Sequence, residues 1–197
     1  MSIAATTVKQ LRDQTGLGMM ECKKALQEVD GDLEKAKDLL RKRGLKAAEL
    51  RTGRSAREGL ISAYIHLNGK IGVLAEVNCE TDFAAGSDDF KQLVKDICMQ
   101  VAATRPKYVD ASGIPEADLA REKEIFSEQV KDKPEHIVEK IVEGKLKDFY
   151  KQVCLLEQPF VKDTSQTVGE LVSSLNAKLG ENIVVRRFVR FEVGEEV

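Results

Sequence analysis

The feature that most restricts the fold of this sequence is an Asn-Gly dipeptide, Asn68 and Gly69, between two β-favouring runs at residues 60–67 and 71–77. Asn-Gly is the strongest two-residue signal for a tight turn between antiparallel strands, because both residues accept a positive φ at little cost. Most other segments have helical patterns, but residues 183–193 predict one more strand. A hairpin joined by a distant strand can form a small antiparallel sheet covered by helices, so the sequence predicts an α+β fold.

The first 45 residues predict three short helices that pack as a bundle. The second helix shows the i, i+3, i+4, i+7 spacing of one apolar face in Cys22, Ala25, Leu26 and Val29. Asp32 can cap the third helix, and Gly44 is expected to end it. We therefore expect a separate three-helix module at residues 1–45, a charged linker at 46–58 and an α+β core at 59–197.

The loop between the first two helices places Leu17, Met19 and Met20 beside two glycines. These apolar side chains could all fill the core of the bundle. Alternatively, some remain outside as an adaptable contact surface, because methionine fits different partners with little strain. The limited core of a three-helix bundle favours the exposed surface slightly.

The second half of the chain predicts a helical hairpin within the core, at about residues 115–151. One helix is expected at 115–130, and another begins at Pro134, a residue suited to a first helical turn. A helix before the hairpin has an apolar face from Phe90 to Val101. After the hairpin, Thr167 and Glu170 have the spacing of a capping box that opens a further helix.

Charge and hydropathy argue against binding to nucleic acid or membranes. The 31 basic and 33 acidic residues give a net charge of -2, so the chain has no overall field that attracts polyanions. The best basic stripe, with Arg186, Arg187 and Arg190 beside two phenylalanines, has acidic neighbours and is explained by a strand in a sheet. No segment approaches the ~18 apolar residues of a membrane helix. Residues 1–10 show no secretory signal, so we expect a cytoplasmic protein.

Candidate catalytic and metal-binding residues are scarce. The sequence has neither a phosphate loop nor a zinc-protease or hydrolase motif, and its two histidines offer few catalytic arrangements. The four cysteines form no C-x-x-C pair, so buried thiols are expected rather than a metal site. We predict no enzyme activity, no cofactor and no bound metal. From the residues alone, the chain is an interaction protein.

Four ordered motifs give a more specific indication. They are TGLGMMECKKAL at residues 15–26, EVNCETDFA at 76–84, LEQPFV at 156–161 and RFEVGE at 190–195. Together they resemble the signatures of the elongation factor Ts family over nearly the whole chain. This resemblance implies an N-terminal module of the ubiquitin-associated type, an α+β core and a protruding, coiled-coil-like helical hairpin. It also implies a partner, elongation factor Tu, which is a GTPase that holds GDP with Mg²⁺.

The resemblance also implies which residues act on that partner. The segment expected to disturb the partner's Mg²⁺ site is Thr81, Asp82, Phe83 and Ala84. An aromatic ring can wedge between helices, and a carboxylate can compete for polar groups near a metal. The alternative is that Phe83 belongs to the core and Asp82 caps the next helix. The residues expected to dock the N-terminal module are Leu11, Met19 and Met20, although these could instead brace the bundle.

The implied function is guanine nucleotide exchange on elongation factor Tu during translation elongation, with GDP released by linked binding and without covalent chemistry. Longer family members carry two copies of the core unit and a C-terminal module, whereas this chain shows one copy and ends at residue 197. We therefore expect a homodimer that supplies the missing half. The alternatives are an adaptor that binds without exchange and an RNA-associated translation protein that uses the arginine stripe.

Overall fold

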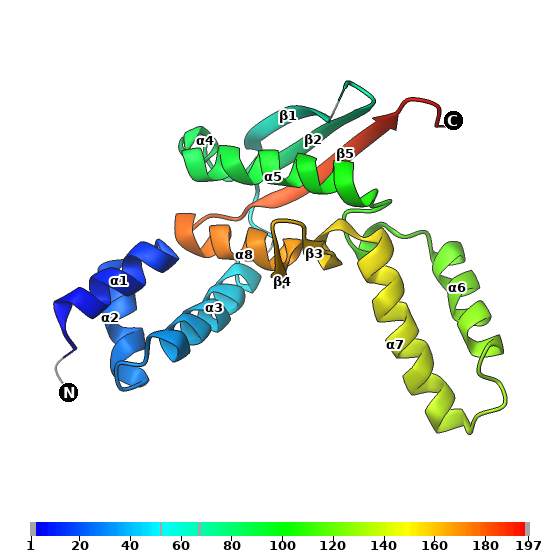
Figure 1. Ribbon diagram of the computed structural model, residues 1–197, viewed down its shortest axis with the longest axis horizontal. Coiled ribbons are helices and arrows are strands. Elements are labelled where there is room, and N and C mark those ends of the chain that lie inside the picture. The colour runs from blue at the N-terminus through cyan, green and yellow to red at the C-terminus, as the bar shows by residue number, and fades with distance from the viewer. Residues whose placement is uncertain (1–2, 52, 67, 196–197) are drawn as a thin grey trace. The chain divides into compact units, whose positions relative to one another are not determined.

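The computed structural model describes residues 3–51, 53–66 and 68–195 of the chain (Figure 1). Its helices are α1 (Ala5–Thr15), α2 (Met19–Glu28), α3 (Leu33–Glu49), α4 (Asp82–Gly86), α5 (Asp88–Thr104), α6 (Glu116–Glu128), α7 (Glu135–Val153) and α8 (Val168–Leu179). Its strands are β1 (Glu58–His66), β2 (Ile71–Cys79), β3 (Pro159–Phe160), β4 (Asp163–Thr167) and β5 (Val184–Glu192). The mixture of helices and a small antiparallel sheet confirms the predicted α+β class.

The chain divides into two compact units. One comprises residues 1–59, 78–90 and 172–184, and the other comprises residues 60–77, 91–171 and 185–197. Several long elements therefore begin in one unit and end in the other. The predicted boundaries of module, linker and core stay a prediction.

The first three helices pack around a core of their own, as expected. Its buried members are Val8, Leu11, Cys22, Ala25, Leu26, Ala36 and Leu40. Gly16 ends α1 with φ +69° and donates its N–H to the Arg12 carbonyl at 2.7 Å. The Asp32 carboxylate opens α3 by accepting from the Glu34 and Lys35 amides, both at 3.1 Å.

Gly44 does not end the third helix, contrary to our prediction. Helix α3 continues through Gly44 to Glu49 and so enters the predicted linker. A Cβ atom at residue 44 would lie 3.1 Å from the Ala177 Cβ in α8. The glycine therefore permits a close approach between two helices, and this use cannot be distinguished from a helix stop in the sequence alone.

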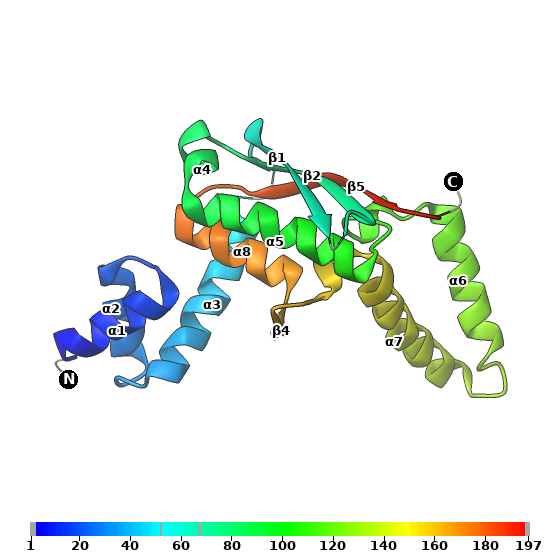
Figure 2. The ribbon, with the colours of Figure 1, turned by 45° about the horizontal axis from the view of Figure 1, so that its top comes forward.

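The predicted hairpin and distant strand form one sheet with the order β1-β2-β5, so β2 is central. Asn68 and Gly69 have φ of 50° and 74° in the turn, which confirms the prediction from their sequence; residue 67, the predicted end of the first strand, lies outside the described residues. Helix α5 runs along one face of the sheet (Figure 2). On that side, the Cys98 thiol donates to the Ser62 carbonyl at 3.5 Å.

The helical hairpin is formed by α6 and α7, and it confirms the prediction for residues 115–151. At its base, Ile114, Val153 and Cys154 form a small buried cluster. Farther along, the rings of Phe126 and Phe149 meet edge to face with centroids 6.5 Å apart. This aromatic contact joins the two helices above that cluster.

The capping box before α8 is present as predicted. The Thr167 amide donates to Glu170 Oε2 at 2.9 Å, and the Glu170 amide donates to Thr167 Oγ1 at 3.1 Å. The two-stranded sheet of β3 and β4, immediately before this helix, was not predicted. Phe160 in β3 is buried.

Candidate functional site

The segment from Thr81 to Ala85 presents an aromatic side chain on a short, capped helix. Thr81 is extended and caps α4, with its Oγ1 accepting from the Ala84 amide at 3.2 Å. Ala84 and Ala85 are buried and fix the inner side of α4. Phe83, on the outer side, is 88% exposed. A large apolar surface displayed in this way is typical of an interaction site.

Both parts of the alternative interpretation of this segment disagree with the structure. Phe83 does not belong to the core, and Asp82 does not act as the cap of α4, because Thr81 does. The following helix, α5, is opened by Ser87, whose Oγ accepts from the Phe90 amide at 3.2 Å. Phe83 and the exposed Asp82 are therefore both available to a partner, and their action on one stays a prediction.

A residue that the sequence interpretation missed supports this segment. Glu181, in the loop between α8 and β5, accepts hydrogen bonds from the Thr81 amide at 3.1 Å and from Thr81 Oγ1 at 2.5 Å. Because about 100 residues separate it from Thr81, no local pattern could have indicated the contact.

The three predicted docking residues are placed differently from one another. Met19 and Met20, at the start of α2, are 43% and 65% exposed. Leu11 is fully buried in the bundle, where the structure gives it the bracing position of the alternative interpretation. Of the three, only the two methionines are therefore exposed, while the neighbouring Leu17 packs partly against the core.

Two of the three arginines in the stripe on β5, Arg187 and Arg190, are paired with carboxylates. Arg187 Nε donates to Glu76 Oε2 at 2.7 Å. Arg190, whose side chain is almost buried, donates to Glu192 at 2.7 Å, and Arg105 also pairs with Glu192. The hydrogen bond from Arg190 is the main cause that lowers the pKa of the Glu192 carboxyl. Arginines whose charge is already paired with carboxylates provide a poor surface for binding nucleic acid.

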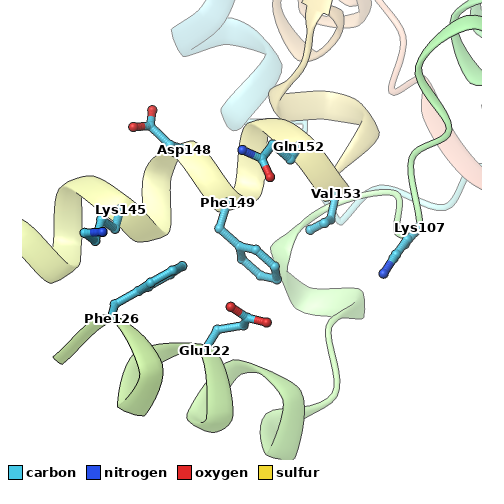
Figure 3. A pocket seen from close by; sticks show the side chains of 8 residues that line it. All are labelled: Lys107, Glu122, Phe126, Lys145, Asp148, Phe149, Gln152 and Val153. Carbon is cyan, nitrogen blue, oxygen red and sulfur yellow. The ribbon is translucent and has the colours of Figure 1, made fainter. Parts of the chain in front are cut away.

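A cavity of about 430 Å³ lies between α6 and α7, near the base of the helical hairpin (Figure 3). The charged side chains that line it are Lys107, Glu122, Lys145 and Asp148, two of each sign. Lys145 Nζ already lies 5.6 Å from the centroid of the Phe126 ring and donates to Gln129 Oε1 at 2.6 Å. Balanced and partly engaged charges do not indicate a particular ligand.

The four cysteines and His66 are held in structural contacts. All four cysteines are free and buried, as expected, and burial raises the pKa of the Cys154 thiol to about 11, so it stays protonated at neutral pH. His66 Nδ1 is engaged with the Tyr64 hydroxyl at 2.8 Å. Within residues 3–51, 53–66 and 68–195, no three or more His, Cys, Asp or Glu side chains gather as metal ligands.

Across the part of the chain that the structure describes, no helix combines the length and apolar character needed to span a bilayer. Phe83, Met19 and Met20 are large apolar side chains left exposed on the described surface, a feature typical of surfaces that bind another protein.

Comparison with known proteins identifies the family. The model of the family described as elongation factor TS matches residues 22–195. An elongation factor Ts from Moorella thermoacetica is 58% identical over 197 residues, which cover 99% of this chain and 97% of that protein. Those from Coprothermobacter proteolyticus and Thermotoga neapolitana are 57% and 53% identical and are matched over their full length. This chain belongs to the elongation factor Ts family, and its role lies in translation elongation.

Proposed function

We propose that this chain is a cytoplasmic guanine nucleotide exchange factor for elongation factor Tu. It binds the GDP form of that GTPase, disturbs the Mg²⁺ and phosphate site with residues 81–84, and so promotes GDP release. Family membership supports the choice of partner. The single observation that carries the proposed mechanism is the 88% exposure of Phe83 on a helix whose next two residues are buried.

The exposed ring can supply a useful part of the required free energy. Burying a phenylalanine side chain contributes about 1.5–3 kcal/mol. Each tenfold weakening of GDP binding needs about 1.4 kcal/mol of preference for the nucleotide-free partner. If Phe83 is buried only in the nucleotide-free complex, it alone weakens the partner's affinity for GDP by roughly tenfold to a hundredfold. The adjacent carboxylate of Asp82 adds an electrostatic effect near the partner's metal.

Exchange then follows from reciprocal linkage. A factor that binds the nucleotide-free partner more tightly than the GDP complex must weaken the partner's affinity for GDP by the same ratio. GTP displaces the factor afterwards through the same relation. No covalent bond is made or broken, so the chain needs neither a catalytic residue nor a cofactor of its own.

We further propose that Met19 and Met20 provide a second contact with the partner. Both are exposed at the start of α2, and unbranched thioether side chains adapt to an uneven surface. A contact that is equally strong with and without GDP raises the affinity of this chain for elongation factor Tu. It leaves unchanged the ratio between the affinities for the nucleotide-free and GDP-bound forms. Substituting both methionines by serine should therefore weaken binding more than it changes the maximal exchange rate.

The outer face of the sheet supports the proposal of a homodimer. Exposed apolar side chains on its strands include Ile61, Ile65, Leu74, Val189 and Phe191, the last being 69% exposed. An apolar face of this kind is usually covered in an oligomer. Sedimentation should give a dimer for the parent chain and a monomer for Phe191→Asp. Ile125→Asp, on α6, is the control, and a parent chain that stays monomeric at all concentrations contradicts the dimer.

The test of exchange follows fluorescent GDP leaving elongation factor Tu, with and without this chain. Asp82→Ala and Phe83→Ala are made separately and together, with Ile125→Ala as an exposed apolar control. We expect the double variant to lose at least tenfold of the acceleration while it still binds. Binding by the parent chain without acceleration would establish an adaptor instead. Salt-sensitive retention of RNA by the parent chain would favour the RNA-associated alternative.

A further inference from the structure

Glu181, in the loop between α8 and β5, uses its carboxylate to hold the segment on which Phe83 lies. Glu181 Oε2 accepts from the amides of Glu80 and Thr81, both at 3.1 Å, while Oε1 accepts from the Thr81 hydroxyl at 2.5 Å. All three bonds involve an ionisable acceptor, and such hydrogen bonds are stronger than neutral ones. One side chain therefore engages the last three donors before α4 begins.

The contact is reciprocal, so each segment fixes the other. Glu80 Oε1 accepts from the Asn182 amide at 2.7 Å and lies 3.7 Å from Arg54 Nη1. The buried Asn182 side chain donates to the Arg54 carbonyl at 2.9 Å. On the other side of the loop, Asn176 Oδ1 accepts from the Ile183 amide at 3.1 Å. The loop that carries Glu181 is thus itself anchored, and it can act as a fixed support.

The support reaches Phe83 through the hydroxyl group of Thr81. That hydroxyl donates to Glu181 and accepts from the Ala84 amide at 3.2 Å. Its donated hydrogen bond therefore orients the oxygen that caps α4. Helix α4 has only five residues, too few for a stable helix without external support. The direction of Phe83 depends on this cap and on the burial of Ala84 and Ala85.

We propose that Glu181 is a positioning residue for nucleotide exchange, which fixes the Thr81 cap and so presents Phe83 in one orientation before the partner arrives. This inference rests on the proposed function. A ring that is already oriented loses less conformational freedom on binding than a mobile one, so more of its burial appears as a preference for the nucleotide-free partner. Glu181 acts through Thr81 and need not touch the partner itself.

The first part of the test does not depend on nucleotide exchange. Hydrogen–deuterium exchange of the free chain is measured at the backbone amides of residues 81, 84 and 85. Glu181→Ala should accelerate exchange at these amides at least tenfold. Glu181→Gln, which keeps one carbonyl oxygen, should give a smaller effect and remains informative if the alanine variant does not fold. Glu139→Ala, an exposed change on α7, is the control. Unchanged protection in Glu181→Gln and Glu181→Ala would overturn the positioning role.

The second part is a double-mutant cycle on GDP release from elongation factor Tu. Glu181→Ala should slow the accelerated release at least tenfold, and adding Glu181→Ala to Phe83→Ala should cost less than a further twofold. Losses that multiply would show that Glu181 acts independently of Phe83 and would overturn the inference. A Phe83→Ala variant with full activity would overturn the proposed function itself, whatever hydrogen exchange shows at residue 81.

Discussion

Gln100 offers a quantitative test of the buried polar network that fixes the segment around β3. This side chain of α5 is fully buried. Its Nε2 donates to Gln158 Oε1 at 3.2 Å and to the Pro159 carbonyl at 3.1 Å, while its Oε1 accepts from the Val161 amide at 2.9 Å. Gln158 Oε1 also accepts from Thr104 Oγ1 at 2.6 Å. The network therefore joins α5 to the chain on both sides of Pro159.

Gln100→Leu retains approximate size and removes all three hydrogen bonds. Gln158 keeps its bond from Thr104, so the main losses fall on the Pro159 carbonyl and the Val161 amide. Each backbone group that loses a partner costs about 1–3 kcal/mol, and the more apolar leucine returns roughly 1 kcal/mol. We expect a net loss of about 1–5 kcal/mol in the free energy of unfolding. For a chain of this size, the corresponding fall in Tm is roughly 2–20 °C.

The assay is urea unfolding followed by circular dichroism, together with thermal unfolding. Gln92→Leu is the matched control, because Gln92 lies exposed on the same helix and makes a hydrogen bond with Asp96. This control should change the unfolding free energy by no more than about 0.5 kcal/mol. If Gln100→Leu costs no more than Gln92→Leu, the network does not stabilise the fold, and the reasoning is refuted.

Three further predictions concern caps, glycines and a thiol. Thr167→Ala removes half of the capping box of α8 and should cost about 1 kcal/mol in urea unfolding; a cost below 0.3 kcal/mol would contradict the cap's contribution. Gly16→Ala should cost about 1–2 kcal/mol, because φ is +69° and the new Cβ would lie 2.7 Å from the Lys178 side chain. Gly144→Ala, with open space in α7, should instead stabilise the chain by about 0.5–1 kcal/mol. Thermal unfolding in which both variants shift Tm in the same direction would refute this contrast. Folding raises the pKa of the Cys154 thiol to about 11, so its contribution to the free energy of unfolding is complete below the unfolded pKa near 9 and is lost as the pH rises through 11. Between these two pH values, Cys154→Ala should therefore lose less stability than the parent chain. Parallel plots of unfolding free energy against pH for the two proteins would contradict the shift.

Those parts of the fold that have local causes could be predicted from the sequence. The turn at Asn68 and Gly69 depends on the φ preferences of two adjacent residues, and the cap of α8 depends on two residues three positions apart. Such signals are complete within a short window, and both are confirmed. The third strand was also placed correctly, because a run that alternates in this way has few other places to pair.

The errors and omissions arise where a residue serves a distant neighbour. Gly44 has the sequence character of a helix stop but serves a close approach to Ala177. The partners of Gln100 lie about 60 residues away, so its burial could not be read from its own helix, where a glutamine normally indicates a solvated face.

The candidate site divides in the same way. Thr81 has the residue type of a cap, and the structure shows that it caps α4. The exposure of Phe83 required the resemblance, because an aromatic residue followed by two alanines equally suits a core helix. The support from Glu181 depends on a loop about 100 residues away and had no sequence signal.

The central position of β2 has a consequence for synthesis on the ribosome. Its partner β1 is only a turn away, but β5 follows about 100 residues later. At roughly 5–20 residues per second, the second edge of β2 stays unpaired for about 5–20 seconds after the hairpin has emerged. An open strand edge in a nascent chain can pair with another chain. Completion of this sheet is therefore a late event, and slower translation between residues 80 and 184 lengthens the period in which the hairpin is open to aggregation.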